Sequence, residues 1–115
     1  MKYKLWCKNK NEWEKDSWVI LPNGNIAWTK FGNIVGCANP KNHILLRSVG
    51  LKDKNGKEIY EGDIVKTKEH IGRIIYSKGM FIIDVKGDFY LPIYNVSEFV
   101  EVIGNIYENP ELLER

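Results

Sequence analysis

The sequence predicts an all-β protein, and three observations support this prediction. Apolar segments are about five residues long, several alternate with polar residues at a period of two, and tight-turn residues separate them. In the second half, a turn, a Gly-Asp-Ile-Val strand and two hairpins follow one another, an order that resembles a small SH3-like barrel. We expect a single domain, with an SH3-like barrel over residues 50–115 packed against a β-meander over residues 1–49.

The first half contains a clear hairpin signal. Pro22-Asn23-Gly24-Asn25 separates two apolar segments, and Asn-Gly in such a place favours a tight turn between antiparallel strands. Near the amino terminus the residues alternate, which places Tyr3 and Leu5 on one face of a strand and Trp6 on the other. The predicted strands of this half cover residues 2–7, 18–21, 26–28, 31–37 and 43–49.

The second half continues the pattern of short strands and turns. Ser77-Lys78-Gly79 and Lys86-Gly87-Asp88 are turn signals. Asn109-Pro110-Glu111 begins a predicted short helix, Pro110–Glu114, because Asn caps well, Pro has the φ of a first helical residue and an acid favours the helix amino terminus. The predicted strands cover residues 63–68, 73–76, 80–85, 89–94 and 99–107.

Two turns lie within the central segment GLKDKNGKEIYEGDIVK, residues 50–66. The first is Asp53-Lys54-Asn55-Gly56, because Asp and Asn bond nearby backbone and Gly tolerates positive φ. The second is Glu61-Gly62-Asp63, and we expect both acids to bond its backbone. A bulge or sharp bend is expected at a glycine of the closing strand. The residues assigned to these structural roles are Asn55, Gly56, Gly62, Asp63 and Gly104.

Three segments, in order along the chain, resemble the YopX family. They are an opening that contains Trp6, the central segment quoted above, and the closing segment VIGNIYENPELL at residues 102–113. The chain departs from the family pattern at Arg47-Ser48-Val49, where the family often has Gln-aromatic-Thr, and at Cys7, where an Asp usually follows the Trp. The resemblance implies a small bacteriophage or prophage protein whose biochemical role is unsettled.

Composition bounds the compartment and the ligands that we expect. The first residues form no continuous apolar stretch, so we expect a cytoplasmic protein without membrane association. The family resemblance implies that this cytoplasm is that of a bacterial host. Cys7 and Cys37 have no CxxC spacing and are expected to be reduced thiols. Neither His43 nor His70 is near either cysteine in sequence. We therefore expect no metal site and no cofactor.

The acids Glu58, Glu61 and Asp63 are the candidates for catalysis. Paired carboxylates perform acid–base chemistry or hold a divalent ion, but these three flank turns, where acids ordinarily bond backbone or water. The chain shows no Ser-His-Asp or Cys-His spacing and no glycine-rich phosphate loop. We therefore expect a protein that is not an enzyme.

The aromatic segment 89–94 predicts an interaction surface. It contains Pro92, which cannot donate to a strand ladder and therefore favours an edge strand. Such edges suit strand addition or oligomerisation, although the segment could instead be buried against the tryptophans of the first half. We expect a protein-interaction or self-assembly module that forms homo-oligomers or binds a host or phage protein. The candidate binding residues are Trp6, Trp13, Arg47, Phe89, Tyr90 and Tyr94.

The alternative is a weak single-stranded nucleic-acid-binding protein acting in phage replication or transcription control. Lysines are interleaved with four tryptophans in the first 30 residues, and in such binders bases stack on exposed aromatics while lysines contact phosphates. Trp18 and Trp28 lie beside apolar residues and are expected in the core, so Trp6 and Trp13 are the exposed candidates. Lys8 and Lys10 are the lysines whose reversal to Glu distinguishes this function.

Overall fold

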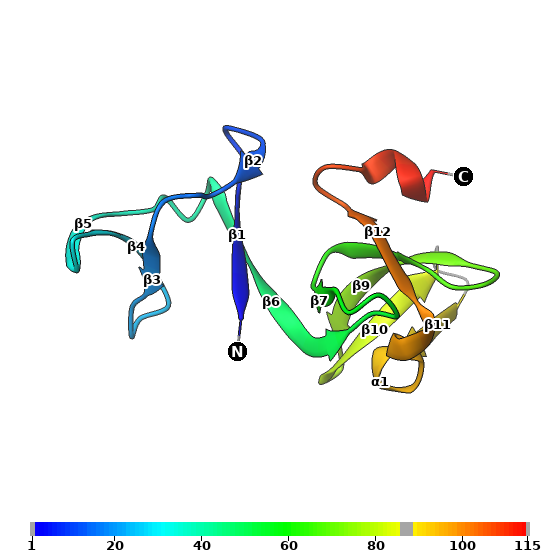
Figure 1. The fold of residues 1–115 in the computed structure, drawn as a ribbon. Helices are drawn as coiled ribbons and strands as arrows, with labels where there is room; N and C mark the ends of the chain where they lie inside the picture. The colour runs from blue at the N-terminus through cyan, green and yellow to red at the C-terminus, as the bar shows by residue number, and fades with distance from the viewer. Residues whose placement is uncertain (1, 86–88, 115) are drawn as a thin grey trace. The chain divides into compact units, whose positions relative to one another are not determined.

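The structure, a computed structural model, describes residues 2–85 and 89–114 and is almost entirely β (Figure 1). The all-β prediction is therefore confirmed. The chain forms two compact units: unit 1 contains residues 1–3 and 46–115, and unit 2 contains residues 4–45. The longest strand, β6 (His43–Lys52), begins in unit 2 and ends in unit 1.

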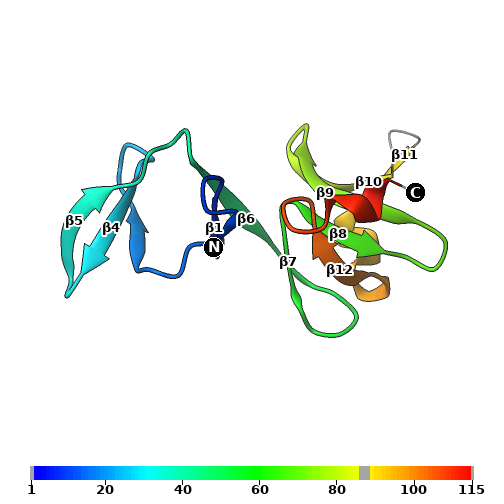
Figure 2. The same ribbon diagram turned by 90° about the horizontal axis from the view of Figure 1, so that it is seen from above.

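Unit 2 contains two groups of paired strands. Most of β1 (Tyr3–Cys7) lies in this unit and pairs with β2 (Glu12–Trp13), a short strand that the sequence did not predict. The other group is an antiparallel sheet in which the order is β3 (Trp18–Ile20), β4 (Ile26–Lys30) and β5 (Asn33–Cys37) (Figure 2).

The hairpin predicted in this unit is confirmed. Residues 21–25 join β3 to β4, and Gly24 has a φ of +87°. The side-chain oxygen of Asn23 accepts a hydrogen bond of 3.0 Å from the backbone N–H of Asn25. Asn marks such turns because its side chain bonds nearby backbone, and Gly marks them because it tolerates positive φ.

Unit 1 contains a five-stranded antiparallel sheet that curls into a half-barrel. Figure 2 shows β8, β9 and β10 side by side, with β12 next to β8. The carboxyl-terminal part of β6 and the whole of β7 (Glu58–Tyr60) also belong to this unit, and they pair with each other. The sheet order is β11 (Phe89–Pro92), β10 (Met80–Val85), β9 (Ile71–Ser77), β8 (Asp63–Lys66), β12 (Glu101–Asn105).

The core of unit 1 lies on one side of this sheet. Alternate residues of β9 and β10 point inward, as a period of two requires. The short helix α1 (Ile93–Val96) contributes Ile93 to the same core. The buried core residues are Val49, Ile59, Val65, Ile74, Phe81, Ile83, Val85, Ile93 and Val100.

Several predicted boundaries are wrong. The strand predicted over residues 89–94 ends at Pro92, and α1 and a 3-10 turn (Ser97–Phe99) follow it. Tyr94 therefore lies on a helical turn, and the closing strand begins at Glu101 instead of residue 99. Pro92 fixes its own φ at −62°, a value compatible with the helical turn that comes next. The turn predicted at residues 86–88 lies outside the described residues.

The predicted terminal helix is only a 3-10 turn, Pro110–Leu113. Asn109 makes no side-chain capping bond to it. Its side-chain oxygen instead accepts a hydrogen bond of 3.3 Å from the backbone N–H of Asn105. The capping group is therefore used to fold the chain back onto the end of β12.

The first central turn is confirmed, and Asp53 is its main organiser. One carboxylate oxygen of Asp53 accepts the backbone N–H of Asn55 at 2.9 Å and that of Lys57 at 2.8 Å. The other oxygen accepts the backbone N–H of Val102, on β12, at 2.9 Å. Gly56 completes the turn with a φ of +81°. The turn between β6 and β7 is thus bonded to a strand 49 residues further along the chain.

The second central turn also has its predicted backbone geometry. Gly62 has a φ of +83°, and Asp63 accepts the backbone N–H of Tyr60 at 2.8 Å. Glu61 differs from the prediction, because its carboxylate bonds Arg47 on β6 and not the turn itself.

The bulge predicted at Gly104 is confirmed by a register shift after Val102. A methyl group on Gly104 would lie 2.6 Å from the Asn109 side-chain oxygen.

The close packing at Gly62 leads to a stability prediction. A methyl group there would lie 2.9 Å from the ring of Tyr107, in a backbone conformation that already disfavours a side chain. We expect Gly62→Ala to lower the free energy of unfolding by about 3 kcal/mol, measured by urea titration. Gly56→Ala is the matched control, since its φ is similar and no described atom lies within 4 Å; we expect about 1 kcal/mol there. Equal losses in the two variants would show that the Tyr107 contact is unimportant.

Candidate functional site

The expectation that Trp6 is exposed is wrong. Its exposed fraction is 3%, and its ring meets that of Trp13 edge-on with centroids 4.9 Å apart. The two residues lie opposite each other on β1 and β2, and directly opposed aromatic residues on paired strands pack closely. Trp13 remains half-buried, and the ammonium of Lys4 lies 5.1 Å from its ring centre. This pair stabilises unit 2 and presents no open stacking platform at Trp6.

The other two tryptophans were expected in the core and are only half-buried. Trp18 and Trp28 lie opposite each other on β3 and β4. The ring of Trp28 meets that of His43 edge-on, with centroids 5.4 Å apart. A three-stranded sheet has too few neighbouring side chains to cover large rings fully.

Arg47 is held within unit 1. Its guanidinium donates to both carboxylate oxygens of Glu61, at 2.8 and 3.1 Å, and its backbone N–H donates to the same carboxylate at 3.0 Å. The guanidinium carbon also lies 4.4 Å from the ring centre of Tyr76. Two parallel charge-assisted bonds of this kind are among the strongest in proteins. The geometry therefore favours a structural role for Arg47 over the predicted binding role.

The electrostatics of this pair agree with its geometry. The hydrogen bond to Glu61 raises the pKa of Arg47. Burial tends to raise the pKa of Glu61, but the hydrogen bonds from the Arg47 side chain and backbone outweigh it, and the pKa is lowered. Both groups are therefore more firmly charged in the folded chain than in the unfolded chain, and the ion pair stabilises the fold.

The segment expected to form an edge does so. β11 is the last strand of the described sheet and pairs only with β10 among the described strands. Tyr90 and Tyr94 have exposed fractions of 63% and 55%. Phe89 is less exposed, and its ring meets that of His70 edge-on with centroids 4.8 Å apart. The sequence also left open that the segment is buried; Tyr90 and Tyr94 are exposed, whereas Ile93 is buried in the core of unit 1.

A second apolar surface was missed by sequence reasoning. Phe31 has an exposed fraction of 93% and occupies, with Gly32, the two-residue turn between β4 and β5. Its φ is +52°, which is unusual for a bulky residue. The signal in the sequence was the pair Phe-Gly where Asn-Gly is expected. The exposed apolar residues of this sheet are Val19, Ile20, Phe31, Ile34 and Val35.

Two lysines and the acid Asp16 are among the residues that line a hollow beside this turn. Lys15 and Lys30 line it together with Trp28 and Phe31, and the Lys30 ammonium lies 5.8 Å from the Phe31 ring centre. Lys8 and Lys10, the lysines selected from sequence, are exposed but do not line the hollow. Lys10 instead lies 4.0 Å from a carboxylate oxygen of Glu14.

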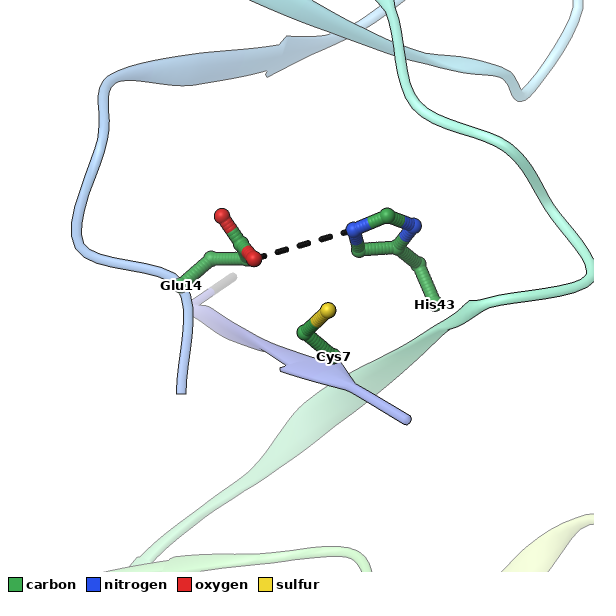
Figure 3. A group of neighbouring side chains, drawn as sticks. All are labelled: Cys7, Glu14 and His43. Carbon is green, nitrogen blue, oxygen red and sulfur yellow. Dashed lines mark ion pairs between the residues drawn. The ribbon is translucent and has the colours of Figure 1, made fainter. Parts of the chain in front are cut away.

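Unit 2 also brings together three side chains that the sequence keeps apart. Figure 3 shows Cys7, Glu14 and His43 pointing toward one another, and their sulfur, oxygen and nitrogen atoms all lie within 4.8 Å of each other. A carboxylate oxygen of Glu14 lies 3.7 Å from Nε2 of His43. Cys7 is 3% exposed, and the side chains of Glu14 and His43 are 5% and 11% exposed.

Sequence distance concealed this cluster. Cys7 ends β1 and His43 begins β6, and these two strands are neighbours in the sheet order. A hydrogen bond of 2.7 Å from the Lys8 backbone N–H to the Asn42 carbonyl oxygen joins their ends. At this strand pair a histidine far from a cysteine in sequence lies close to it in space.

The described part of the chain contains no helix long and apolar enough to cross a membrane.

The Arg47–Glu61 pair leads to a prediction of pH dependence. Because the pKa of Glu61 is lowered from its ordinary value of 4.5, its stabilisation is fully present above that pH and is lost as the pH falls through the folded value. We expect Glu61→Gln to lower the free energy of unfolding at pH 7 by about 2 kcal/mol. Below pH 4.5, the free energy of unfolding of this variant should fall less steeply with decreasing pH than that of the parent protein. Urea titrations between neutral and acid pH test this, with the exposed Glu98→Gln as control. Parallel pH curves for Glu61→Gln and the parent protein would contradict it.

Comparison with known proteins places this chain in a family. The YopX protein family matches residues 2–114. The SPbeta prophage-derived uncharacterized protein YopX of Bacillus subtilis (strain 168) is 27% identical over 128 residues, which cover 97% of this chain and 95% of that protein. The crystal structure of protein EF1440 from Enterococcus faecalis has a TM-score of 0.66 and 28% identity, covering 97% of this chain and 96% of that one.

The X-ray structure of protein yopX from Bacillus subtilis gives the same TM-score of 0.66, with 29% identity over 96% of each chain. The match to the family covers nearly all of the chain, including the opening, central and closing segments. This chain belongs to the YopX family.

Proposed function

We propose that this chain is a phage- or prophage-encoded, non-enzymatic accessory protein that works as a self-assembly module in the bacterial host cytoplasm. The half-barrel of unit 1 serves as an SH3-like scaffold, and the edge strand β11 pairs with β11 of a second copy. The Bacillus subtilis relative is named as prophage-derived, and its match to this chain covers 95% of its length. This supports the proposed origin. The assembly is supported by the geometry of the β11 edge.

The single observation that carries the proposal is an edge strand flanked by exposed tyrosines. Tyr90 lies on β11 and Tyr94 lies on the helical turn that follows it, and more than half of each side chain's surface is exposed. Tyrosine contributes a large apolar area and a hydroxyl group at low entropic cost, so it is enriched in interfaces. A twofold axis beside β11 would place the same residues of both copies in contact.

The side chains must supply most of the free energy of this association. β11 has four residues and ends in Pro92, which has no N–H to donate. A short edge of this kind offers few backbone hydrogen bonds, a feature that also limits uncontrolled aggregation. Association therefore depends on Tyr90 and Tyr94 more than on the strand itself.

The acids of the central segment support a role without catalysis. Glu58 binds the ammonium of Lys2 at 2.9 Å and the hydroxyl of Ser48 at 3.2 Å. Glu61 is occupied by Arg47, and Asp63 by the backbone of Tyr60. Each of these three carboxylates therefore has a partner within the fold, which supports a structural role for them.

Sedimentation of variants tests the assembly. We expect the parent protein to form a dimer and the double variant Tyr90→Ser, Tyr94→Ser to associate at least about tenfold more weakly, which corresponds to about 1.4 kcal/mol. Met80→Ser is the matched control, because Met80 is an exposed apolar residue of β10 that does not pair with β11. A parent protein that sediments as a monomer, or a double variant that remains dimeric, contradicts the proposal.

A second candidate function, weak binding of single-stranded nucleic acid, is favoured by the hollow beside Phe31. An exposed aromatic ring with two lysines at the same hollow offers stacking and phosphate contacts together. The net charge of +2 is small for such a binder, and self-assembly therefore stays the preferred function.

Anisotropy of a labelled oligonucleotide distinguishes the two functions. If nucleic acid binds at the hollow, Lys30→Glu should weaken binding and lower its salt dependence, because one phosphate contact is lost. Lys8→Glu, Lys10→Glu makes a larger change of charge away from the hollow. If only that double variant loses binding, the phosphate contacts are made by Lys8 and Lys10, the lysines selected from sequence. No binding by the parent protein would remove this candidate.

A further inference from the structure

We propose that Cys7, Glu14 and His43 form a binding site for a single Zn²⁺ ion in unit 2, with three protein ligands and a fourth position for water. The three groups are a thiol, a carboxylate and an imidazole, the donor types found in zinc sites. Thiolate and imidazole together favour Zn²⁺ over Mg²⁺ or Ca²⁺, which prefer oxygen ligands.

The separation of the donor atoms fits one ion after a small contraction. Around tetrahedral zinc, ligand atoms at their usual bond lengths lie about 3.5 Å from one another. The Glu14 oxygen and His43 Nε2 are 3.7 Å apart, and no pair among the three exceeds 4.8 Å. A shift of about 1 Å, well within reach of side-chain rotation, would bring all three to bonding distance.

His43 is already oriented as a zinc-binding histidine. Its Nδ1 lies 2.9 Å from the carbonyl oxygen of Asn39, so a proton on Nδ1 is donated there and Nε2 is left as the metal-binding atom. Zinc ligands of this type almost always donate their second nitrogen to a carbonyl or carboxylate. The same carbonyl accepts the Asn42 backbone N–H at 3.0 Å, which fixes the acceptor itself.

Packing holds the imidazole and the thiol in place. The Trp28 ring lies edge-on to His43 and restricts its rotation. The low exposure of Cys7 argues against a nucleophilic cysteine, which must reach a substrate. A buried ligand that meets two other donors is better suited to holding an ion than to attacking a bound molecule.

The charge of the site changes when the ion binds. The Cys7 thiol must lose its proton to solvent to become a thiolate, and His43 must be neutral, so binding releases protons. The ammonium of Lys10, 4.0 Å from Glu14, competes with the ion for the carboxylate. Its side chain is 61% exposed, and it can therefore move into solvent when zinc binds.

Titration of the tag-free full chain with Co²⁺, as a spectroscopic substitute for zinc, tests the proposal. We expect one equivalent to bind with a thiolate-to-metal absorption band and to be displaced by Zn²⁺. The chain has two cysteines, and Cys37 is exposed on β5. In Cys37→Ser the remaining thiol is Cys7, so the band must persist there if Cys7 is the ligand.

Ligand variants give the matched comparison. Cys7→Ser should abolish the band, and Glu14→Gln should weaken binding at least about tenfold. Lys10→Gln should bind as tightly as the parent protein or more tightly, because a competing cation is removed. At the same zinc concentration, zinc should raise the melting temperature of the parent protein and of Cys37→Ser by more than that of Glu14→Gln.

Two results overturn the site: no thiolate band in the parent protein, or a band that is lost in Cys37→Ser and kept in Cys7→Ser. If the Cys7 and Glu14 variants fail to fold, the Cys37→Ser variant still tests the site, because the thiolate-to-metal absorption band is either present or absent in it. The outcome is independent of self-assembly, which Tyr90 and Tyr94 test separately.

Discussion

Unit 1 depends most on the hydrogen bonds that the carboxylate of Asp53 accepts. It receives three backbone N–H groups, two from its own turn and one from Val102 on the closing strand. Burial disfavours its charge, but these bonds outweigh that cost and lower its pKa. The backbone bond from Lys54 to the carbonyl of Val100, at 2.9 Å, runs beside them. The sheet therefore closes where a local turn and a distant strand share one buried charge.

The other polar residues of the central segment are used in the same way. Glu61 is bonded to β6, Asp63 to the residue before its turn, and Gly62 accepts the close approach of Tyr107. In the central segment, one of the three by which this chain resembles its family, these residues are thus explained by folding. The most exposed large aromatic side chains lie elsewhere and include Phe31, Phe99 and Tyr90.

Local chemistry accounts for what the sequence predicted well. The turns at Gly24, Gly56 and Gly62 depend on residues adjacent in the chain, and the edge position of β11 was indicated locally by Pro92. The failures at Trp6 and at the cluster of Cys7 and His43 involve pairing over distance, whereas those at Pro92 and Pro110 concern where local helical turns begin and end. Trp6 was expected to be exposed because nothing local shows that Trp13 lies across from it on an unpredicted strand. The cluster of Cys7 and His43 likewise requires knowing that β1 and β6 are neighbours.

The conformation of Phe31 has a consequence for engineering. At its backbone angles an asparagine is the more favourable residue, and its exposed ring gains little from the fold. A selection for heat resistance would therefore tend to replace this phenylalanine early, as one of the easiest gains in the chain. Such a selection would at the same time erase the most exposed aromatic group of the surface. Thermal robustness is thus a poor guide to which residues of this protein are worth keeping.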